Sequence, residues 1–227
     1  MKPSKPILIT IDGPAGAGKT TVSRALAEAV GYRYIDTGAL YRAVALAASR
    51  EEIDLENDAG LQRLCSGLDL SFDRTEAGTR LLMNGEDVTG LIRTPQMSMM
   101  ASAVSARPVV RRFLLSVQKE LGRNKEAVFE GRDMGTVVFP EAEAKFFLDA
   151  STRVRAERRF REIAATASVT LDEVQQDIIR RDKNDSTRSI APLKPAQDAV
   201  IIDSSGMSVD DVVEKMLTCI GEVTARH

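Results

Sequence analysis

The sequence predicts an α/β fold, in which a five-stranded parallel sheet with helices on both faces carries an inserted antiparallel lobe and a helical flap. Three observations predict this fold. Five short apolar runs are separated by stretches with helical periodicity. A long interval between the second and third runs alternates as antiparallel strands do. After the fourth run, an arginine-dense stretch repeats its apolar residues at helical spacing.

The five apolar runs are the predicted strands of the parallel sheet. Continuous runs rich in β-branched residues are typical of strands that are buried on both faces. A helix-like stretch that ends at Gly31 follows the first run, and this order predicts a strand, a loop and a helix. The runs are ILITI (7–11), YRYID (32–36), AVFEG (127–131), AKFFLDA (144–150) and DAVIIDS (198–204).

The interval between the second and third strands predicts a lobe of its own, inserted at 39–124. It begins as a helix, alternates in LDLSFD and TRLLMNGEDV, and ends in a helical segment. The letters NGED mark a hairpin-like turn. Two arginine-rich helices at 151–190 predict a flap. We therefore expect a single domain over 1–227, with its core formed by 1–38, 125–150 and 191–227.

Composition limits the classes of protein that fit. The 227 residues, 43% hydrophobic and 28% charged, are ordinary for one globular enzyme-sized unit. A net charge of −2 offers no electrostatic footprint for nucleic acid or an anionic membrane, so neither partner is expected. Without a long apolar run or a signal-peptide core, a cytoplasmic location is expected.

The inventory of side chains also excludes several chemistries. The chain has one histidine, His227, which is the last residue of the sequence. A Ser-His-Asp triad would therefore lack its base, and no histidine and cysteine cluster exists that could bind zinc. Catalysis must rest on lysine, arginine, aspartate and glutamate.

The stretch GPAGAGKT (13–20) matches the phosphate-loop pattern, between a predicted strand and a predicted helix. Glycines allow successive backbone N–H groups to point at an anion, and the helix N-terminus adds positive potential. Lys19 would reach the β- and γ-phosphates, and the Thr20 hydroxyl would ligate Mg²⁺. The residues expected to bind ATP are Asp12, Gly13, Pro14, Ala15, Gly16, Ala17, Gly18, Lys19, Thr20 and Thr21.

A second anion site is predicted at the same edge of the sheet. DTGALYR (36–42) ends the second strand, with Thr37 as a helix cap and Arg42 about a turn inside the helix. EGRDMGT (130–136) ends the third strand with Arg132 and Asp133. Open α/β sheets bind ligands at the carboxyl ends of their strands. Two phosphate-bearing ligands are therefore expected to meet there.

A phosphate loop alone does not separate the possible functions. DKND (182–185) and DSSG (203–206) imitate the guanine-reading and D-x-x-G motifs of GTPases, but their order is reversed. The alternatives to a nucleotide kinase are a GTPase, a kinase for another small acceptor such as UMP or shikimate, and a noncatalytic nucleotide-regulated binding module.

Five segments together resemble bacterial cytidylate kinases, in the same order and across nearly the whole chain. The resemblance implies a nucleoside monophosphate kinase in which 39–124 is the acceptor lobe and 151–190 is the lid. It also implies the transfer of phosphate from ATP to CMP, and to dCMP as a second acceptor. Mg²⁺ is expected to accompany ATP, and a monomeric state is expected. The segments are ITIDGPAGAGKTT, DTGALYRAVA, EGRDMGTVVFP, FFLDAS and IAPLKPAQDAVIIDS.

The resemblance also implies which residues bind CMP. Cytosine offers an amine donor beside two acceptors, which suits Asp133 and Ser102 facing the amine and Arg111 facing the acceptors. Arg42 and Arg132 are then left for the phosphate, and the flap residues Arg181 and Asp185 for the ribose. The full set is Thr37, Tyr41, Arg42, Ser102, Arg111, Arg132, Asp133, Arg181, Asp185 and Arg188.

The expected mechanism follows from charge. Phosphoryl transfer needs donor and acceptor held in line and the charge of the transferring group neutralised, so no general base is required. Glu130, at a strand end, is expected to hold the metal through water, together with Thr20. Lid arginines are drawn from Arg155, Arg158, Arg159, Arg181 and Arg188, and the residues expected to be catalytic are Lys19, Arg132, Arg158 and Arg188.

Overall fold

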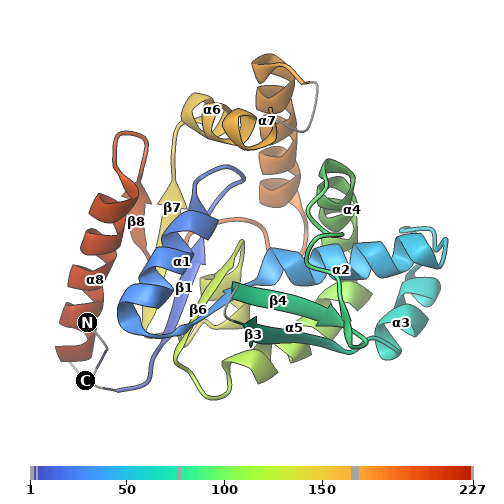
Figure 1. Ribbon diagram of the computed structural model, residues 1–227, viewed down its shortest axis with the longest axis horizontal. Coiled ribbons are helices and arrows are strands. Elements are labelled where there is room, and N and C mark those ends of the chain that lie inside the picture. Colours follow the sequence, from blue (N-terminus) through green and yellow to red (C-terminus); the bar gives the residue numbers. More distant parts are fainter. Residues whose placement is uncertain (1–2, 4, 76–77, 165–168, 226–227) are drawn as a thin grey trace. The chain divides into compact units, whose positions relative to one another are not determined.

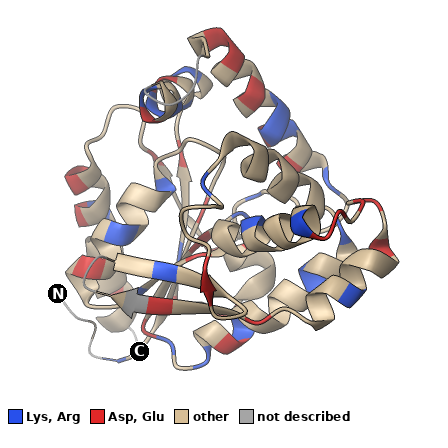
Figure 2. Cartoon of the chain, turned by 45° about the vertical axis from the view of Figure 1, so that its right-hand side comes forward, with Lys and Arg blue, Asp and Glu red and all other residues tan. Residues whose placement is uncertain are grey.

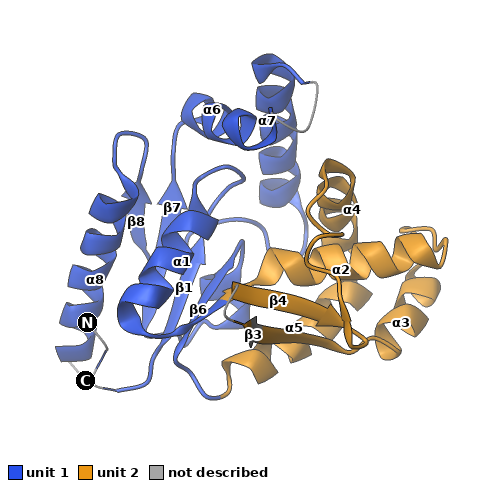
Figure 3. Cartoon of the chain, viewed as in Figure 1, with its two compact units in different colours: residues 1–34, 124–227 blue, residues 35–123 orange. Residues whose placement is uncertain are grey.

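A computed structural model of the chain describes residues 3, 5–75, 78–164 and 169–225. The chain divides into two compact units (Figure 3). Unit 1 consists of residues 1–34 and 124–227, and unit 2 consists of residues 35–123. No helix among the described residues is long and apolar enough to cross a membrane.

The five predicted strands are confirmed, and they form one parallel sheet in the order β2-β6-β1-β7-β8 (Figure 1). Every residue of β1 and β6 is buried, which explains why these strands read as continuous apolar runs without alternation. The register pairs Asp12 with Gly131 across β1 and β6. The strands are β1 (Leu8–Asp12), β2 (Arg33–Asp36), β6 (Ala127–Gly131), β7 (Ala144–Asp149) and β8 (Val200–Asp203).

Two helices, α1 (Lys19–Val30) and α8 (Val209–Ala225), contribute to the hydrophobic core of unit 1. Leu26 and Met216 pack there with the buried isoleucines of β1. Helix α1 ends at Gly31, whose φ of 69° is left-handed and whose N–H bonds back to the last turn, as a glycine cap does.

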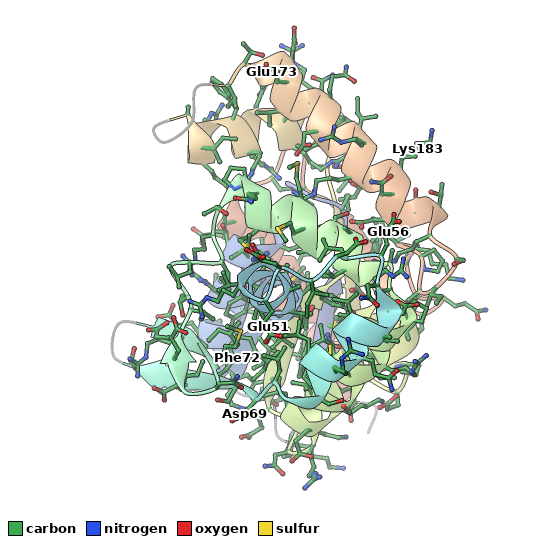
Figure 4. All side chains as sticks on the ribbon, turned by 90° about the vertical axis from the view of Figure 1, so that its right-hand side faces the viewer. Glu51, Glu56, Asp69, Phe72, Glu173 and Lys183 are labelled. Atoms are coloured by element: carbon green, nitrogen blue, oxygen red, sulfur yellow. The ribbon has the colours of Figure 1, made fainter. Side chains whose placement is uncertain are left out.

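A second pair of helices lies between β7 and β8 in the chain: α6 (Thr152–Ile163) and α7 (Leu171–Thr187). They share a small apolar cluster of their own, centred on Ala156, Val174 and Ile178. A capping box of Thr170 and Glu173 starts α7, and Figure 4 shows Glu173 near that end and Lys183 further along. Charges of both signs follow α7 (Figure 2).

Unit 2 contains the predicted antiparallel sheet, in the order β3-β4-β5. The turn between β4 and β5 has positive φ at both Asn84 (51°) and Gly85 (82°), as a two-residue hairpin turn requires. Phe72 and Asp69, labelled in Figure 4, lie in and just before β3. The elements are α2 (Thr37–Arg50), α3 (Asp58–Ser66), β3 (Leu70–Thr75), β4 (Gly78–Met83), β5 (Glu86–Asp87), α4 (Pro95–Ser105) and α5 (Pro108–Gly122).

Candidate active site

The glycine-rich loop joins β1 to α1 and runs close against two other elements of unit 1. A Cβ atom added to Gly13, whose φ is 152°, would lie 2.0 Å from the carbonyl oxygen of Leu148 on β7. At Gly16, whose φ is 76°, it would lie 2.9 Å from the carbonyl oxygen of Arg155 on α6. Only glycine fits such positions, because any side chain would meet backbone atoms.

Lys19, the first residue of α1, is buried, with 5% of its surface exposed. Its Nζ donates a hydrogen bond of 2.7 Å to the carbonyl oxygen of Pro14 inside the loop. Burial lowers the pKa of Lys19 to about 7, and repulsion from Arg132 adds to that effect, while nearby carboxylates oppose it. The lysine therefore sits where a negative ligand would stabilise its charge.

Arg132 lies close to two other cations, Lys19 and Arg181. The pKa of Arg181 on α7 is lowered, first by burial and then by repulsion from Arg132. The charge of Arg132, which follows the end of β6, thus lowers the pKa of both Lys19 and Arg181. Nearby carboxylates offset part of this repulsion, and a bound phosphate would offset more of it.

Carboxylates hold the arginines at this place. Arg132 Nε lies 3.0 Å from Asp185 Oδ2 of α7. Arg188 Nη2 lies 3.5 Å from Asp133 Oδ1, and Arg188 Nη1 lies 3.9 Å from Asp185 Oδ1. Four of the predicted substrate-binding residues are therefore brought together within unit 1, from the end of β6 and from the C-terminal part of α7.

Glu130 of β6 accepts hydrogen bonds from two hydroxyl groups. Its Oε1 accepts from Thr20 Oγ1 at 2.9 Å, and its Oε2 accepts from the hydroxyl of Tyr34 at 2.7 Å. Arg24 lies over the Tyr34 ring, with its Cζ 5.3 Å from the ring centroid. Mg²⁺ prefers oxygen ligands of this kind, commonly one or two carboxylates together with substrate phosphates, so Thr20 and Glu130 fit that ion. Sequence reasoning missed Tyr34, which no motif marks.

Two arginines of α6 contact the phosphate loop itself. Arg155 Nη1 donates to the carbonyl oxygen of Ala15 at 3.0 Å and to Asp182 Oδ2 of α7 at 2.6 Å. Arg158 Nη1 donates to the carbonyl oxygen of Ala17 at 3.3 Å, and its Nη2 donates to that of Ser204 at 2.7 Å. In this structure, both guanidinium groups therefore bind loop carbonyls as well as other groups of unit 1.

Asp12 was predicted as part of the phosphate-binding loop, but its carboxylate bonds elsewhere. Oδ1 accepts from the backbone N–H of Met134 at 2.9 Å, and Oδ2 from that of Gly135 at 2.8 Å. These two residues begin the π-helical turn η1 (Met134–Val138). Burial raises the pKa of Asp12 to about 6, and the two backbone hydrogen bonds oppose that rise. Sequence reasoning missed this connection.

The remaining predicted acceptor residues belong to unit 2. Asp36, not Thr37 as predicted, caps α2, because the extended backbone of Asp36 lets its Oδ1 accept from Ala39 N at 3.0 Å. Thr37 is instead the first residue of the helix, and Asp36 Oδ2 also lies 2.7 Å from Arg42 Nη2.

A second predicted group consists of Tyr41 on α2, Ser102 on α4 and Arg111 on α5. Arg111 Nη1 donates to the carbonyl oxygen of Ser105 at 3.2 Å. The Cζ of Arg111 lies 5.8 Å from the ring centroid of Tyr41. Ser102 lies on α4, where its carbonyl oxygen accepts from Ser105 Oγ at 2.8 Å. Arg111 and Tyr41 are thus neighbours within unit 2.

Comparison with known proteins gives a consistent result. A family model described as Cytidylate kinase matches residues 9–222. A cytidylate kinase from Geobacter sulfurreducens is 49% identical over 217 residues, which cover 95% of this chain and 93% of that protein. A cytidylate kinase from Pasteurella multocida is 43% identical over 218 residues, with 96% of each chain covered.

Solved structures share the fold at much lower sequence identity. A shikimate kinase from Bacteroides thetaiotaomicron has a TM-score of 0.50 at 15% identity, covering 96% of this chain and 99% of that chain. A gluconokinase from Sinorhizobium meliloti has a TM-score of 0.50 at 17% identity, covering 97% and 95%. The architecture is therefore one that small-molecule kinases use.

Proposed function

We propose that this chain, which belongs to the cytidylate kinase family, transfers the γ-phosphoryl group of ATP to CMP, forming ADP and CDP. The observation that supports the proposal most directly is the buried Lys19 of the phosphate loop, whose charge is repelled by that of Arg132, as is the charge of Arg181. A site in which cations crowd in this way is suited to polyphosphate ligands, whose charge it neutralises.

On the donor side, the loop N–H groups and Lys19 bind the triphosphate. Lys19 would carry its full charge once the β- and γ-phosphates replace its present surroundings. Thr20 and Glu130 would hold Mg²⁺, which, when bound, neutralises charge on the β- and γ-oxygens of ATP. Burial of the site keeps water away from the transferring group, so that hydrolysis does not compete with transfer.

On the acceptor side, Arg132 and Arg188 would bind the phosphate of CMP in exchange for their present carboxylate partners. This exchange would leave Asp185 available, with Arg181, for the ribose hydroxyls, and Asp133 available for the cytosine amine. The family resemblance adds Thr37, Tyr41, Arg42, Ser102 and Arg111 to the acceptor residues. The use of dCMP, a cytoplasmic location, a monomeric state and the absence of nucleic-acid and membrane partners stay predictions from the sequence.

An acceptor panel tests the proposed function. ADP release is measured with ATP and, in turn, CMP, dCMP, UMP, AMP and shikimate. We expect the highest kcat/KM with CMP, at least about tenfold above that with UMP, because one misplaced donor or acceptor in a built site costs more than a missing methylene group. Fastest turnover with shikimate or AMP would contradict the proposal.

Replacement of Tyr34 by Phe is expected to weaken the affinity for Mg²⁺ without removing activity. The hydroxyl holds one oxygen of Glu130, and its loss frees that carboxylate to rotate away from Thr20. Loss of partners that orient metal ligands typically costs about tenfold or more in metal affinity. The dissociation constant of a fluorescent ATP analogue is measured as Mg²⁺ is titrated. We expect the Mg²⁺ concentration that halves this constant to rise severalfold, and kcat at saturating Mg²⁺ to stay near normal.

The matched control for this change is Tyr32→Phe. Tyr32 is another tyrosine of unit 1 and is buried, but its hydroxyl accepts from Ile7 N and donates to the Lys5 carbonyl oxygen, both at 3.3 Å. Tyr32→Phe should leave the affinity for Mg²⁺ unchanged. An identical Mg²⁺ titration for Tyr34→Phe and the unaltered protein would show that Tyr34 does not position Glu130.

A further inference from the structure

We propose that Asp12 is a positioning residue that fixes the turn after Arg132 and Asp133 relative to the phosphate loop, and so sets the alignment of acceptor with donor. The inference deepens the proposed function and rests on it. It concerns a side chain that, in this structure, bonds to backbone groups of a neighbouring loop.

Asp12 lies at the end of β1, where the phosphate loop begins. It is the last residue of β1 and directly precedes Gly13, the first glycine of the phosphate loop. Across the sheet it pairs with Gly131, the last residue of β6, which directly precedes Arg132. The two loops that would hold donor and acceptor therefore leave the sheet from adjacent strands, at the same register position.

Beyond that point, the Asp12 carboxylate joins the two loops. The register of β1 and β6 ends at Asp12 and Gly131, so strand pairing no longer fixes the chain. Each oxygen of the Asp12 carboxylate accepts from one of two successive N–H groups, Met134 and Gly135, at 2.9 and 2.8 Å. One rigid, planar group thus fixes both the position and the orientation of the peptide that follows Asp133.

The turn is also closed by backbone hydrogen bonds to Asp133. The carbonyl oxygen of Asp133 accepts from the N–H groups of Val137 and Val138, at 2.9 and 3.1 Å. The backbone of Asp133 is therefore determined by the turn, and the turn is attached to β1 through Asp12. A shift of Asp12 would move Asp133, and Arg132 with it.

Position 12 requires a carboxylate. Asp12 is only 3% exposed, and burial disfavours its charge, as its raised pKa shows. A neutral asparagine would avoid that cost, but one of its two terminal groups is an N–H donor and would face another N–H donor. Only a carboxylate can accept at both positions, and in-line transfer is sensitive to displacements of about 1 Å.

The test is Asp12→Asn in the full-length protein. We expect kcat/KM for CMP to fall roughly ten- to hundredfold, because the acceptor loop is displaced. The dissociation constant of a fluorescent ATP analogue should change less than about twofold, since in the structure the Asp12 side chain bonds to Met134 and Gly135. Hydrogen exchange at the amides of Met134 and Gly135 should become markedly faster.

Thr10→Val is the matched control. Thr10 lies two residues earlier on the same face of β1, is fully buried, and its Oγ1 has no hydrogen-bond partner among the described residues. A Cβ atom on Gly135 would lie 3.1 Å from that oxygen, so the control probes the same turn without removing a bond to it. Its kinetics and amide exchange should match those of the unaltered protein.

Asp12→Glu gives an independent arm if the asparagine variant does not fold. It keeps both acceptor oxygens but displaces them by one methylene group, so we expect the same selective loss with CMP and retained protection of the two amides. Equal losses of ATP and CMP affinity in either variant, or unchanged exchange at Met134 and Gly135 in Asp12→Asn, would overturn the inference. Absence of CMP turnover in the unaltered protein would instead contradict the proposed function, and the amide exchange would still report on Asp12.

Discussion

Replacement of Lys19 by Met is expected to lower kcat by roughly a hundred- to ten thousandfold, which is the largest effect we predict. The lysine is the cation placed inside the phosphate loop, and a preorganised charge of this kind stabilises the transition state more than it stabilises bound ATP. Steady-state kinetics with ATP and CMP measure the loss. The control is Lys215→Met, which removes an exposed lysine of α8 and should leave kcat unchanged.

The fold should tolerate the loss of Lys19. Burial disfavours its charged form, so the unfolded chain binds this proton more readily than the folded chain does. The resulting cost to stability grows as the pH falls from the ordinary pKa of 10.5 to the folded value of about 7, and it is constant below that. At neutral pH, Lys19→Met should therefore unfold at no lower a temperature than the unaltered protein.

ATP binding should also take up a proton on Lys19. Burial lowers the pKa of the unliganded lysine, so that at mildly alkaline pH part of the protein carries a neutral Lys19, and a bound triphosphate raises that pKa again. Calorimetric titration in two buffers of different ionisation enthalpy measures the uptake, which Lys19→Met should abolish. A folded Lys19→Met protein with ordinary turnover would exclude the catalytic role.

Replacement of Asp133 by Asn is expected to reduce the preference for CMP over UMP by roughly tenfold or more, which corresponds to about 1.4 kcal/mol. An ionised carboxylate accepts from the cytosine amine and repels the carbonyl oxygen that uracil has in its place. An amide can turn either its donor or its acceptor toward the base. We therefore expect kcat/KM for CMP to fall and that for UMP to fall less, or to rise.

The structure supplies the control for Asp133, because this carboxylate also lies 3.5 Å from Arg188. Arg188→Met removes that partner without changing the proposed base contact, and it should lower activity with CMP and UMP in equal proportion. If Asp133→Asn has the same equal effect, the carboxylate acts through Arg188, and another residue must read the base.

The strands, the glycine loop and the family could be predicted from the sequence alone, because these depend on local pattern. Apolar runs such as that of β1 mark buried strands wherever they occur in the chain. The spacing from Gly13 to Thr20 likewise specifies a phosphate loop within a few residues. Even a local prediction failed at α2, where Asp36 and Thr37 are adjacent and both suited to capping, so that only the backbone conformation decided between them.

Contacts between side chains that are distant in the chain could not be predicted from the sequence. Sequence reasoning had no means to pair Tyr34 with Glu130, or Asp12 with the backbone of Met134, because those contacts depend on the strand order β2-β6-β1. The lowered pKa of Lys19 could not be predicted either, because it depends on burial. The physical reason is that desolvation and bond partners are properties of the surroundings in space, and elements far apart in the chain supply those surroundings.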